Sequence, residues 1–174
     1  MKYELTPPFD EKTIRSLRAG DRVELSGTVY TGRDAAHKRL VAMLDAGEKL
    51  PVDLSGQAIY FVGPCPAPPG RPIGSAGPTT SGRMDAYSPR LIAECGLRGM
   101  IGKGDRNDGV KAAMKEYGCV YFAATGGAGA LIANSIVSAE VVAFPDLGPE
   151  AIYKLELNKL PLVVAIDSEG DSLY

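Results

Sequence analysis

Short apolar runs alternate with segments of helical periodicity through the middle of this chain, and that alternation restricts its fold more than any other feature. The runs AIYFVG (58–63), GMIGKG (99–104) and VYFAA (120–124) have the length and composition of buried strands. Before the last run, NDGVKAAMKEYG (107–118) carries apolar residues at helical spacing and ends on a glycine. Strands that alternate with helices are typical of an α/β fold.

One further strand changes the sheet that we expect. Residues 22–30, RVELSGTVY, alternate between polar and apolar side chains, as a strand with one solvated face does. The sequence therefore predicts a mixed sheet with helices on one face and a second, smaller, partly antiparallel sheet, in a single domain over residues 1–174. The same patterns predict helices at 10–19 and 31–48, the latter capped by Thr31 or Asp34, a helix that starts from a Ser88 N-cap, and strands at 141–144 and 160–166.

Composition excludes several functional classes. Hydrophobic residues make up 45% of the chain and charged residues 23%, with a formal net charge of −2, so no broad nucleic-acid-binding surface is indicated. No apolar run approaches the roughly 20 residues of a membrane helix, and the charged N-terminus lacks the pattern of a signal peptide, so we expect a cytoplasmic protein. One histidine and three scattered cysteines argue against a metal site or a disulfide framework in this chain. Cys95 and Cys119 are expected to be buried apolar residues, and Cys65 has no assigned role.

The segment GSAGPTTSGRMD, residues 74–85, carries unusual chemistry for a loop. Turn-forming residues on both sides predict irregular backbone, and a long, varied loop inside a compact domain is more often functional than a linker. It presents the hydroxyls of Thr79 and Thr80 and the guanidinium of Arg83, with almost nothing apolar.

Two other cations occupy comparable positions. Arg33 lies between a glycine and a helix start, where a cation opposes the helix dipole, so it is either a solvated arginine or an anion clamp. Lys103 lies in a Gly-Lys-Gly turn after a strand, a pattern that also occurs on ordinary surfaces. Loops that follow strands converge at one edge of an open α/β sheet. Together with Arg83 and the two threonines, these cations would suit a small polyanion such as a dicarboxylate.

A glycine-rich turn, ATGGAGA (124–130), also follows a strand and opens a predicted helix. It resembles a phosphate-binding loop, but the GxGxxG pattern is not met, and the IGKGD segment is not a P-loop. Close packing of a helix start against the sheet, with an anion or a partner chain nearby, is the simpler explanation.

Four segments resemble a known family in their order and spacing: YTGRDAAHKR, IYFVGPCPAPPGRPIGSAGPTTSGRMD, GMIGKGD and YFAATGGAGAL. They are similar to the C-terminal part of class I fumarate hydratases and equally to the beta subunit of L-tartrate dehydratase. The resemblance covers nearly the whole chain and implies a swivelling β/β/α three-layer domain. It also implies the separate beta subunit of a split enzyme, whose oxygen-sensitive 4Fe-4S cluster is held by a cluster-bearing alpha subunit in an α2β2 heteromer and not by this chain.

The resemblance also implies roles for five residues. Thr79, the first threonine of the PTTSGR block, is implied to be the catalytic base, and Thr80 and Arg83 are implied substrate contacts. Arg33 of GRDAAH and Lys103 of IGKG are implied to hold the substrate carboxylates. The sequence does not depart from the family pattern at these positions.

The implied reaction suits these side chains. Hydration of fumarate, run backwards, removes a proton next to a carboxylate and expels a hydroxyl, and the developing enediolate needs fixed cations. The hydroxyl needs a Lewis acid, which the resemblance assigns to an iron of the partner's cluster. A threonine is a poor base in water, so Lys103 or an acid from the partner is an alternative base, with Thr79 only hydrogen-bonding the substrate.

Three functions remain open at this point. A hydro-lyase subunit for fumarate and malate, with tartrate as the close alternative, predicts activity only beside a cluster-bearing subunit. A non-catalytic anion- or nucleotide-binding module that uses the TGGAG turn predicts ligand binding by the isolated chain without iron. A structural domain whose Gly/Pro loop is a docking surface predicts that Thr79→Ala leaves every activity intact.

Overall fold

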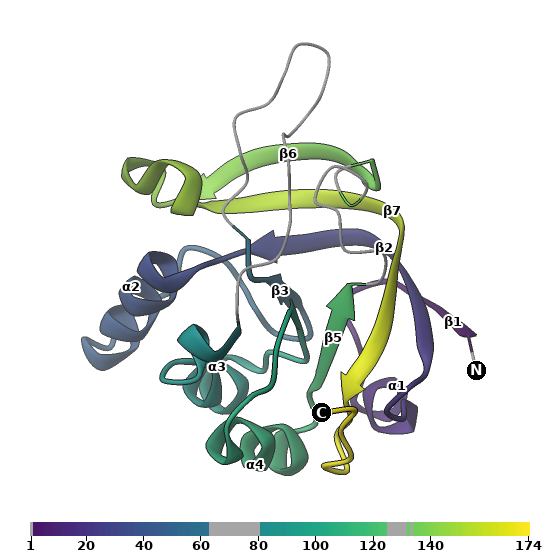
Figure 1. Ribbon diagram of the computed structural model, residues 1–174. Coiled ribbons are helices and arrows are strands. Elements are labelled where there is room, and N and C mark those ends of the chain that lie inside the picture. The colour runs from purple at the N-terminus through teal and green to yellow at the C-terminus, as the bar shows by residue number, and fades with distance from the viewer. Residues whose placement is uncertain (1, 63–80, 125–131, 133) are drawn as a thin grey trace.

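The computed structural model of the chain describes residues 2–62, 81–124, 132 and 134–174 (Figure 1). Within these ranges the chain forms strands, α-helices and two short 3-10 helices, and the mixed α/β class predicted from the sequence is confirmed. No helix in these ranges is long and apolar enough to span a bilayer. In chain order the elements are β1 (Lys2–Leu5), α1 (Glu11–Ser16), β2 (Arg22–Thr31), α2 (Asp34–Asp45), β3 (Ala58–Tyr60), η1 (Ser81–Met84), α3 (Ser88–Cys95), β4 (Gly99–Gly102), α4 (Asp108–Tyr117), β5 (Val120–Ala124), β6 (Ile136–Ala143), η2 (Pro145–Glu150) and β7 (Ile152–Ile166).

Helix α4 begins and ends where its residues predict. The Asn107 side chain caps it by accepting a hydrogen bond from the backbone nitrogen of Val110 at 2.9 Å. Gly118 ends it with a φ of 81°, in the left-handed region that favours glycine. The helical spacing predicted a buried face of Val110, Ala113, Met114 and Tyr117; the first three are buried, whereas Tyr117 is 44% exposed.

Two predicted helix caps are wrong. Ser88 is the first residue of α3 rather than its N-cap, because its hydroxyl donates a hydrogen bond to the Met84 carbonyl oxygen at 3.1 Å. The N-cap of α2 is Arg33, which makes no side-chain capping bond. Thr31 belongs to β2, where its hydroxyl accepts a hydrogen bond from the backbone of β7, and Asp34 is the first residue of the helix.

The strands form one sheet in the order β1-β2-β3-β4-β5-β7-β6, and β2 also pairs with β7. That additional pairing closes β2, β3, β4, β5 and β7 into a five-stranded barrel. Strands β2 to β5 are parallel to one another, whereas β7 runs antiparallel to both of its barrel neighbours. The expected second sheet is therefore wrong for the described residues, because the half-polar strand β2 joins the main sheet and finds its antiparallel partner there.

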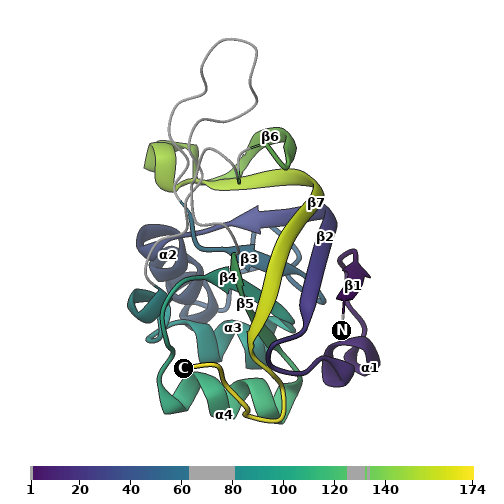
Figure 2. The same ribbon diagram turned by 45° about the vertical axis from the view of Figure 1, so that its right-hand side comes forward.

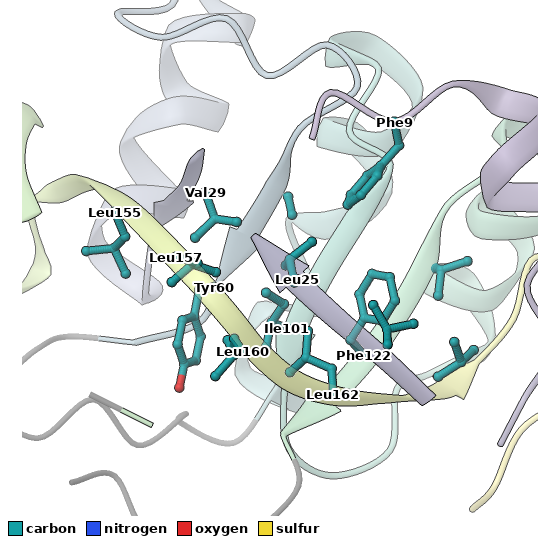
Figure 3. Packing of buried hydrophobic residues seen from close by; sticks show 14 of the residues in the cluster. Phe9, Leu25, Val29, Tyr60, Ile101, Phe122, Leu155, Leu157, Leu160 and Leu162 are labelled. Carbon is teal, nitrogen blue, oxygen red and sulfur yellow. The ribbon is translucent and has the colours of Figure 1, made fainter. Parts of the chain in front are cut away.

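Two hydrophobic clusters occupy the two sides of the barrel wall. Figure 3 shows side chains such as Tyr60, Ile101 and Phe122 gathered between the strands. Ile59 and Phe61, the neighbours of Tyr60 in sequence, belong instead to the second cluster, which includes residues of α2, α3 and α4. These three helices lie on the same side of the barrel in both views (Figures 1 and 2). Each large apolar side chain that is fully buried stabilises the fold by about 1.5–3 kcal/mol, so the barrel is a firm base for the loops that leave it.

Candidate active site

The four parallel strands of the barrel end level with one another. Thr31 pairs with Tyr60, and Tyr60 pairs with Ile101. On the next pair of strands, Gly102 lies opposite Ala123. The carboxyl ends of β2, β3, β4 and β5 therefore form one rim, the part of an α/β protein where ligands commonly bind.

Arg33 stands at this rim between β2 and α2. The backbone nitrogen of Gly32 donates to the Tyr60 carbonyl oxygen at 3.0 Å, which ties the turn to β3. The Arg33 carbonyl oxygen accepts hydrogen bonds from the backbone nitrogen of His37 at 3.0 Å and from its Nδ1 at 2.8 Å. Nε of Arg33 is buried and has no hydrogen-bond partner among the described residues. A buried, unpaired guanidinium nitrogen is costly, which favours an anion clamp over a solvated arginine.

Arg83 reaches the same helix start from η1. Its Nη2 and Nε lie 2.7 Å and 2.8 Å from Oδ2 of Asp34. Because both side chains are partly exposed, this ion pair stabilises the fold by less than about 1 kcal/mol. Its main effect is on position, since it fixes the Arg83 guanidinium at the residue that follows Arg33. Oδ1 of Asp34 is buried and without a hydrogen-bond partner within the described part of the chain.

Lys103 follows β4 at the rim, and its backbone anchors η1. The backbone nitrogen of Ser81 donates to the Lys103 carbonyl oxygen at 2.9 Å. This close approach requires a glycine at position 102, because a Cβ on Gly102 would lie 1.9 Å from Oγ of Ser81 and 2.9 Å from the Phe61 ring. The contacts of Asp34 and Ser81 thus bring the three predicted cations, Arg33, Arg83 and Lys103, to one rim.

The predicted threonines, Thr79 and Thr80, lie outside the described residues, as do Cys65 and all but the first residue of the ATGGAGA segment. The residue that follows Thr80 in the sequence is Ser81, whose buried side chain has a defined place. Its Oγ is 2.6 Å from the hydroxyl of Tyr121, which donates to the Gly104 carbonyl oxygen at 2.7 Å. Burial raises the pKa of the Tyr121 hydroxyl well above its ordinary value, so this phenol stays protonated.

Charges at the rim favour an anionic ligand, though the helix start is already partly occupied. The backbone nitrogen of Ala35 lies 3.4 Å from Oε1 of Glu150, so one amide of the first turn of α2 already has an anionic partner. Besides Arg33, Arg83 and Lys103, the rim holds the carboxylates of Asp34, which pairs with Arg83, and of Glu150. The side chains rather than the helix amides are the groups suited to bind the ligand.

His37 is buried and is hydrogen-bonded to the backbone of Arg33. Its ring lies edge-on to Phe61 with the ring centroids 5.4 Å apart. Burial lowers its pKa from 6.5 to about 4; the nearby charge of Arg106 lowers it too, and the bond to the Arg33 carbonyl partly opposes the shift. The imidazole is therefore neutral at neutral pH, and Nδ1 carries the proton that it donates to Arg33. Among the described residues Nε2 has no hydrogen-bond partner.

Sequence reasoning missed the most buried cation near the rim, Arg106, and its partner Asp85. Nε of Arg106 donates to Oδ1 of Asp85 at 2.6 Å, and the Arg106 side chain is fully buried. Both residues were visible as the last charges of the SGRMD and GKGDR segments. Their pairing could not be read from a separation of 21 positions.

A hollow of about 600 Å³ lies elsewhere, at the start of β2. Lys2, Glu24 and Leu173 are among its lining residues, and none of the three rim cations lines it. The chemistry of this hollow does not match the predicted dicarboxylate site.

The two described cysteines do not fit an iron-sulfur cluster. Such a cluster needs thiolates. Burial raises the pKa of Cys119 to about 12, and burial likewise raises the pKa of Cys95 on α3. Nor do the described residues contain a group of three or more His, Cys, Asp or Glu side chains placed to hold a metal ion.

The chain matches the model of a known protein family over nearly its whole length. The family model described as "Fumarase C-terminus" matches residues 2–174. The chain belongs to the fumarase C-terminus family. The match covers the rim, so Arg33, Arg83 and Lys103 lie within the matched residues.

Relatives of the fumarase C-terminus family differ in how they carry this domain. "Fumarate hydratase class I, aerobic" of Escherichia coli is 42% identical over 177 residues, which is 100% of this chain and 32% of that protein. "Putative fumarate hydratase class I" of Geobacillus stearothermophilus is 39% identical over 98% of this chain and 33% of its own length. The chain therefore spans about a third of the length of these fumarate hydratases. "Putative L(+)-tartrate dehydratase subunit beta" of Methanocaldococcus jannaschii is 41% identical over 94% of this chain and 87% of that protein.

Proposed function

We propose that this chain is the beta subunit of a two-subunit hydro-lyase that reversibly hydrates fumarate to (S)-malate. The observation that carries the proposal is the convergence of Arg33, Arg83 and Lys103 at the carboxyl rim of the barrel, in a member of the fumarase C-terminus family. A dicarboxylate presents two charged groups, and the two guanidinium forks and one ammonium are suited to hold them.

The proposed roles of the chain's own residues follow from this geometry. Arg33, whose Nε has no partner among the described residues, and Lys103 grip the substrate carboxylates, and Arg83 provides a third contact held in place by Asp34. As a proton leaves the carbon next to a carboxylate, negative charge develops on that carboxylate. Cations that are already in place stabilise this charge without having to reorganise.

Thr79 is proposed as the group that removes this proton, with Thr80 as a further substrate contact. These roles rest on the family resemblance of the PTTSGR block and on the fixed position of Ser81 next to it. Lys103 and an acid from a partner remain the alternative bases.

The iron-sulfur cluster of this enzyme class is proposed to belong to a cluster-bearing alpha subunit, in an α2β2 assembly. The chemistry of Cys95 and Cys119 supports this division, since both thiols have raised pKa values. The fumarate hydratases that match are about three times as long as this chain, so they have room for such a part. The family resemblance further suggests a swivelling arrangement of this domain and a cytoplasmic location.

L-tartrate dehydration is the second candidate, favoured by one specific observation. The Methanocaldococcus jannaschii relative named as a tartrate dehydratase subunit beta is matched over 87% of its own length. Tartrate and malate differ by one hydroxyl, and both present two carboxylates to the rim. The three cations would serve either substrate.

An anaerobic assay with fumarate and L-tartrate in parallel tests the proposal. The chain is assayed alone and with a cluster-bearing subunit from the same source. We expect activity only in the mixture, and the substrate with the higher kcat/KM names the enzyme. A mixture with an intact cluster that turns over neither substrate would overturn the proposal.

A further inference from the structure

A buried ion pair joins the loop that carries Arg83 to a second loop, which carries Lys103. The proposed reaction does not use this ion pair. Asp85 lies two residues after Arg83, and Arg106 lies three residues after Lys103. Nε of Arg106 is 2.6 Å from Oδ1 of Asp85. The other carboxylate oxygen, Oδ2, accepts a hydrogen bond from the backbone nitrogen of Asn107 at 3.0 Å. Asp85 is thus bound by the side chain and by the backbone of the second loop.

All three guanidinium nitrogens of Arg106 have partners. Besides the bond from Nε, Nη2 donates to Oγ of Ser88 at 2.6 Å, and Nη1 lies 3.2 Å from the sulfur of Met100. The guanidinium carbon lies 5.1 Å and 5.2 Å from the ring centroids of Phe61 and Tyr121. A lysine could supply the charge but not this planar set of contacts. The orientation of Arg106 is therefore fixed on every side.

The same two loops are joined again on the other side of the site residues. Ser81 N binds the Lys103 carbonyl oxygen at 2.9 Å, and the Tyr121 hydroxyl bridges Ser81 and Gly104. Arg83 therefore lies between two anchors on its own loop. On the second loop, Lys103 is itself the partner of Ser81, and the partners of Asp85, Arg106 and Asn107, follow three and four residues later.

We propose that Arg106 and Asp85 are positioning residues that set the separation between Arg83 and Lys103 and so match the rim to the length of its dicarboxylate. This inference rests on the proposed function. Burying two charges costs desolvation energy that their attraction offsets only in part, so an apolar pair of similar volume is often equally stable. The geometry of the rim, rather than stability, is then what the ion pair contributes.

The double variant Asp85→Asn with Arg106→Met distinguishes an effect on the position of the two loops from an effect on the stability of the fold. It removes both charges together, so neither is left buried without its partner, and asparagine still offers an oxygen to the Asn107 backbone nitrogen. Arg90→Met is the matched control, because Arg90 is another arginine in ion pairs, with Asp45 and Glu94, but on the outer surface of α3.

The first measurement uses the isolated chain and needs no activity. We expect the double variant to melt within about 4 °C of wild type. The amide of Ser81 should exchange its hydrogen at least about tenfold faster, because its bond to Lys103 is no longer held from the other side. Wild-type exchange of the Ser81 amide in a folded double variant would overturn the inference.

The second measurement is steady-state kinetics in the complex with the cluster-bearing subunit. We expect kcat/KM to fall at least about tenfold in the double variant, mainly through KM, and to be unchanged in Arg90→Met. Arg106→Lys keeps the charge and should raise KM by a smaller factor, and it decides the question if the double variant does not fold. Wild-type KM in a folded Arg106→Lys variant would then overturn the inference. An inactive wild-type complex would contradict the proposed function instead. The hydrogen exchange of the Ser81 amide would still test whether Arg106 and Asp85 position the two loops.

Discussion

Asp34 holds Arg83 in place, with one carboxylate oxygen 2.7 Å from Nη2 and 2.8 Å from Nε of the guanidinium. The two residues are 49 positions apart, and the contact places η1 over the start of α2. One arginine of the site is therefore positioned by the neighbour of the other, since Asp34 directly follows Arg33. The pair is partly exposed, so its contribution should appear in binding rather than in folding.

Asp34→Asn tests this relationship. The asparagine removes the charge that holds Arg83, and we expect KM for the dicarboxylate to rise by about fivefold, equivalent to about 1 kcal/mol. The melting temperature should change little. A lower KM in steady-state assays would mean that Asp34 competes with the substrate for Arg83 instead of positioning it.

Arg33→Lys should impair substrate binding. Lysine keeps the charge but loses the bidentate fork, so we expect kcat/KM to fall by about tenfold. Arg39→Lys on the same helix, where Arg39 pairs with Asp146 at 2.9 Å on the surface, is the control. Unchanged kinetics for Arg33→Lys would show that Arg33 is a solvated arginine.

Thr79→Ala should abolish most turnover while the chain still folds, because a loop hydroxyl contributes little to a core. Loss of a proton-transferring group lowers kcat by about 100-fold or more. Thermal melting of the variant checks the fold, and single-turnover kinetics in the complex check the chemistry. Turnover at the wild-type rate would return the base assignment to Lys103 or to the partner.

His37 should make stability depend on pH below neutrality. Its pKa is about 4 in the folded protein and 6.5 when exposed, so the unfolded chain binds more protons between these values. Stability is then complete above pH 6.5 and falls as the pH is lowered, by about 2 kcal/mol at pH 5 relative to pH 8. Denaturant unfolding at a series of pH values measures this change in the free energy of unfolding.

His37→Asn provides the comparison, because asparagine can still donate to the Arg33 carbonyl but does not titrate. The chain has one histidine, so this variant removes every imidazole. The slope of stability between pH 5 and pH 6.5 should largely disappear. An unaltered slope would assign the pH dependence to carboxylates.

Gly102→Ala should displace Ser81 and with it the loop that carries Arg83. The added Cβ would lie 1.9 Å from Oγ of Ser81, so the loop has to move away from Lys103. We expect kcat/KM to fall by at least about tenfold, with a loss of stability of about 1–3 kcal/mol from overpacking. Gly109→Ala is the control, since the nearest atom to a Cβ there is 3.5 Å away. Equal effects of the two variants would exclude the steric explanation.

The sequence predicted those features of the fold that depend on local chemistry. Helical spacing and the closing glycine placed α4. The sequence predicted only residues 160–166 of β7, because the first half of the strand carries several polar residues and lacks a continuous apolar run. Closure of the barrel could not be predicted, since the pairing of β2 with β7 has no local signature.

The sequence likewise predicted some residues of the candidate site and not others. Arg33, Arg83 and Lys103 were recognisable as cations in glycine-flanked turns after strands. The residues that support them were not, because Asp34, His37 and Arg106 act through contacts that only the folded chain creates. The packing of His37 and Arg106 against the Phe61 ring has no counterpart in periodicity or composition.

The pairing of β2 with β7 also has a consequence for how the protein is made. Arg22 lies opposite Val163, so β2 pairs with a strand that is synthesised long after it. Contacts of such long sequence separation slow folding, and β2 keeps an unpaired edge until β7 has been synthesised. The nascent chain should therefore depend on chaperones that shield strand edges, and substitutions in β7 should lower the yield of folded protein more than their effect on its final stability suggests.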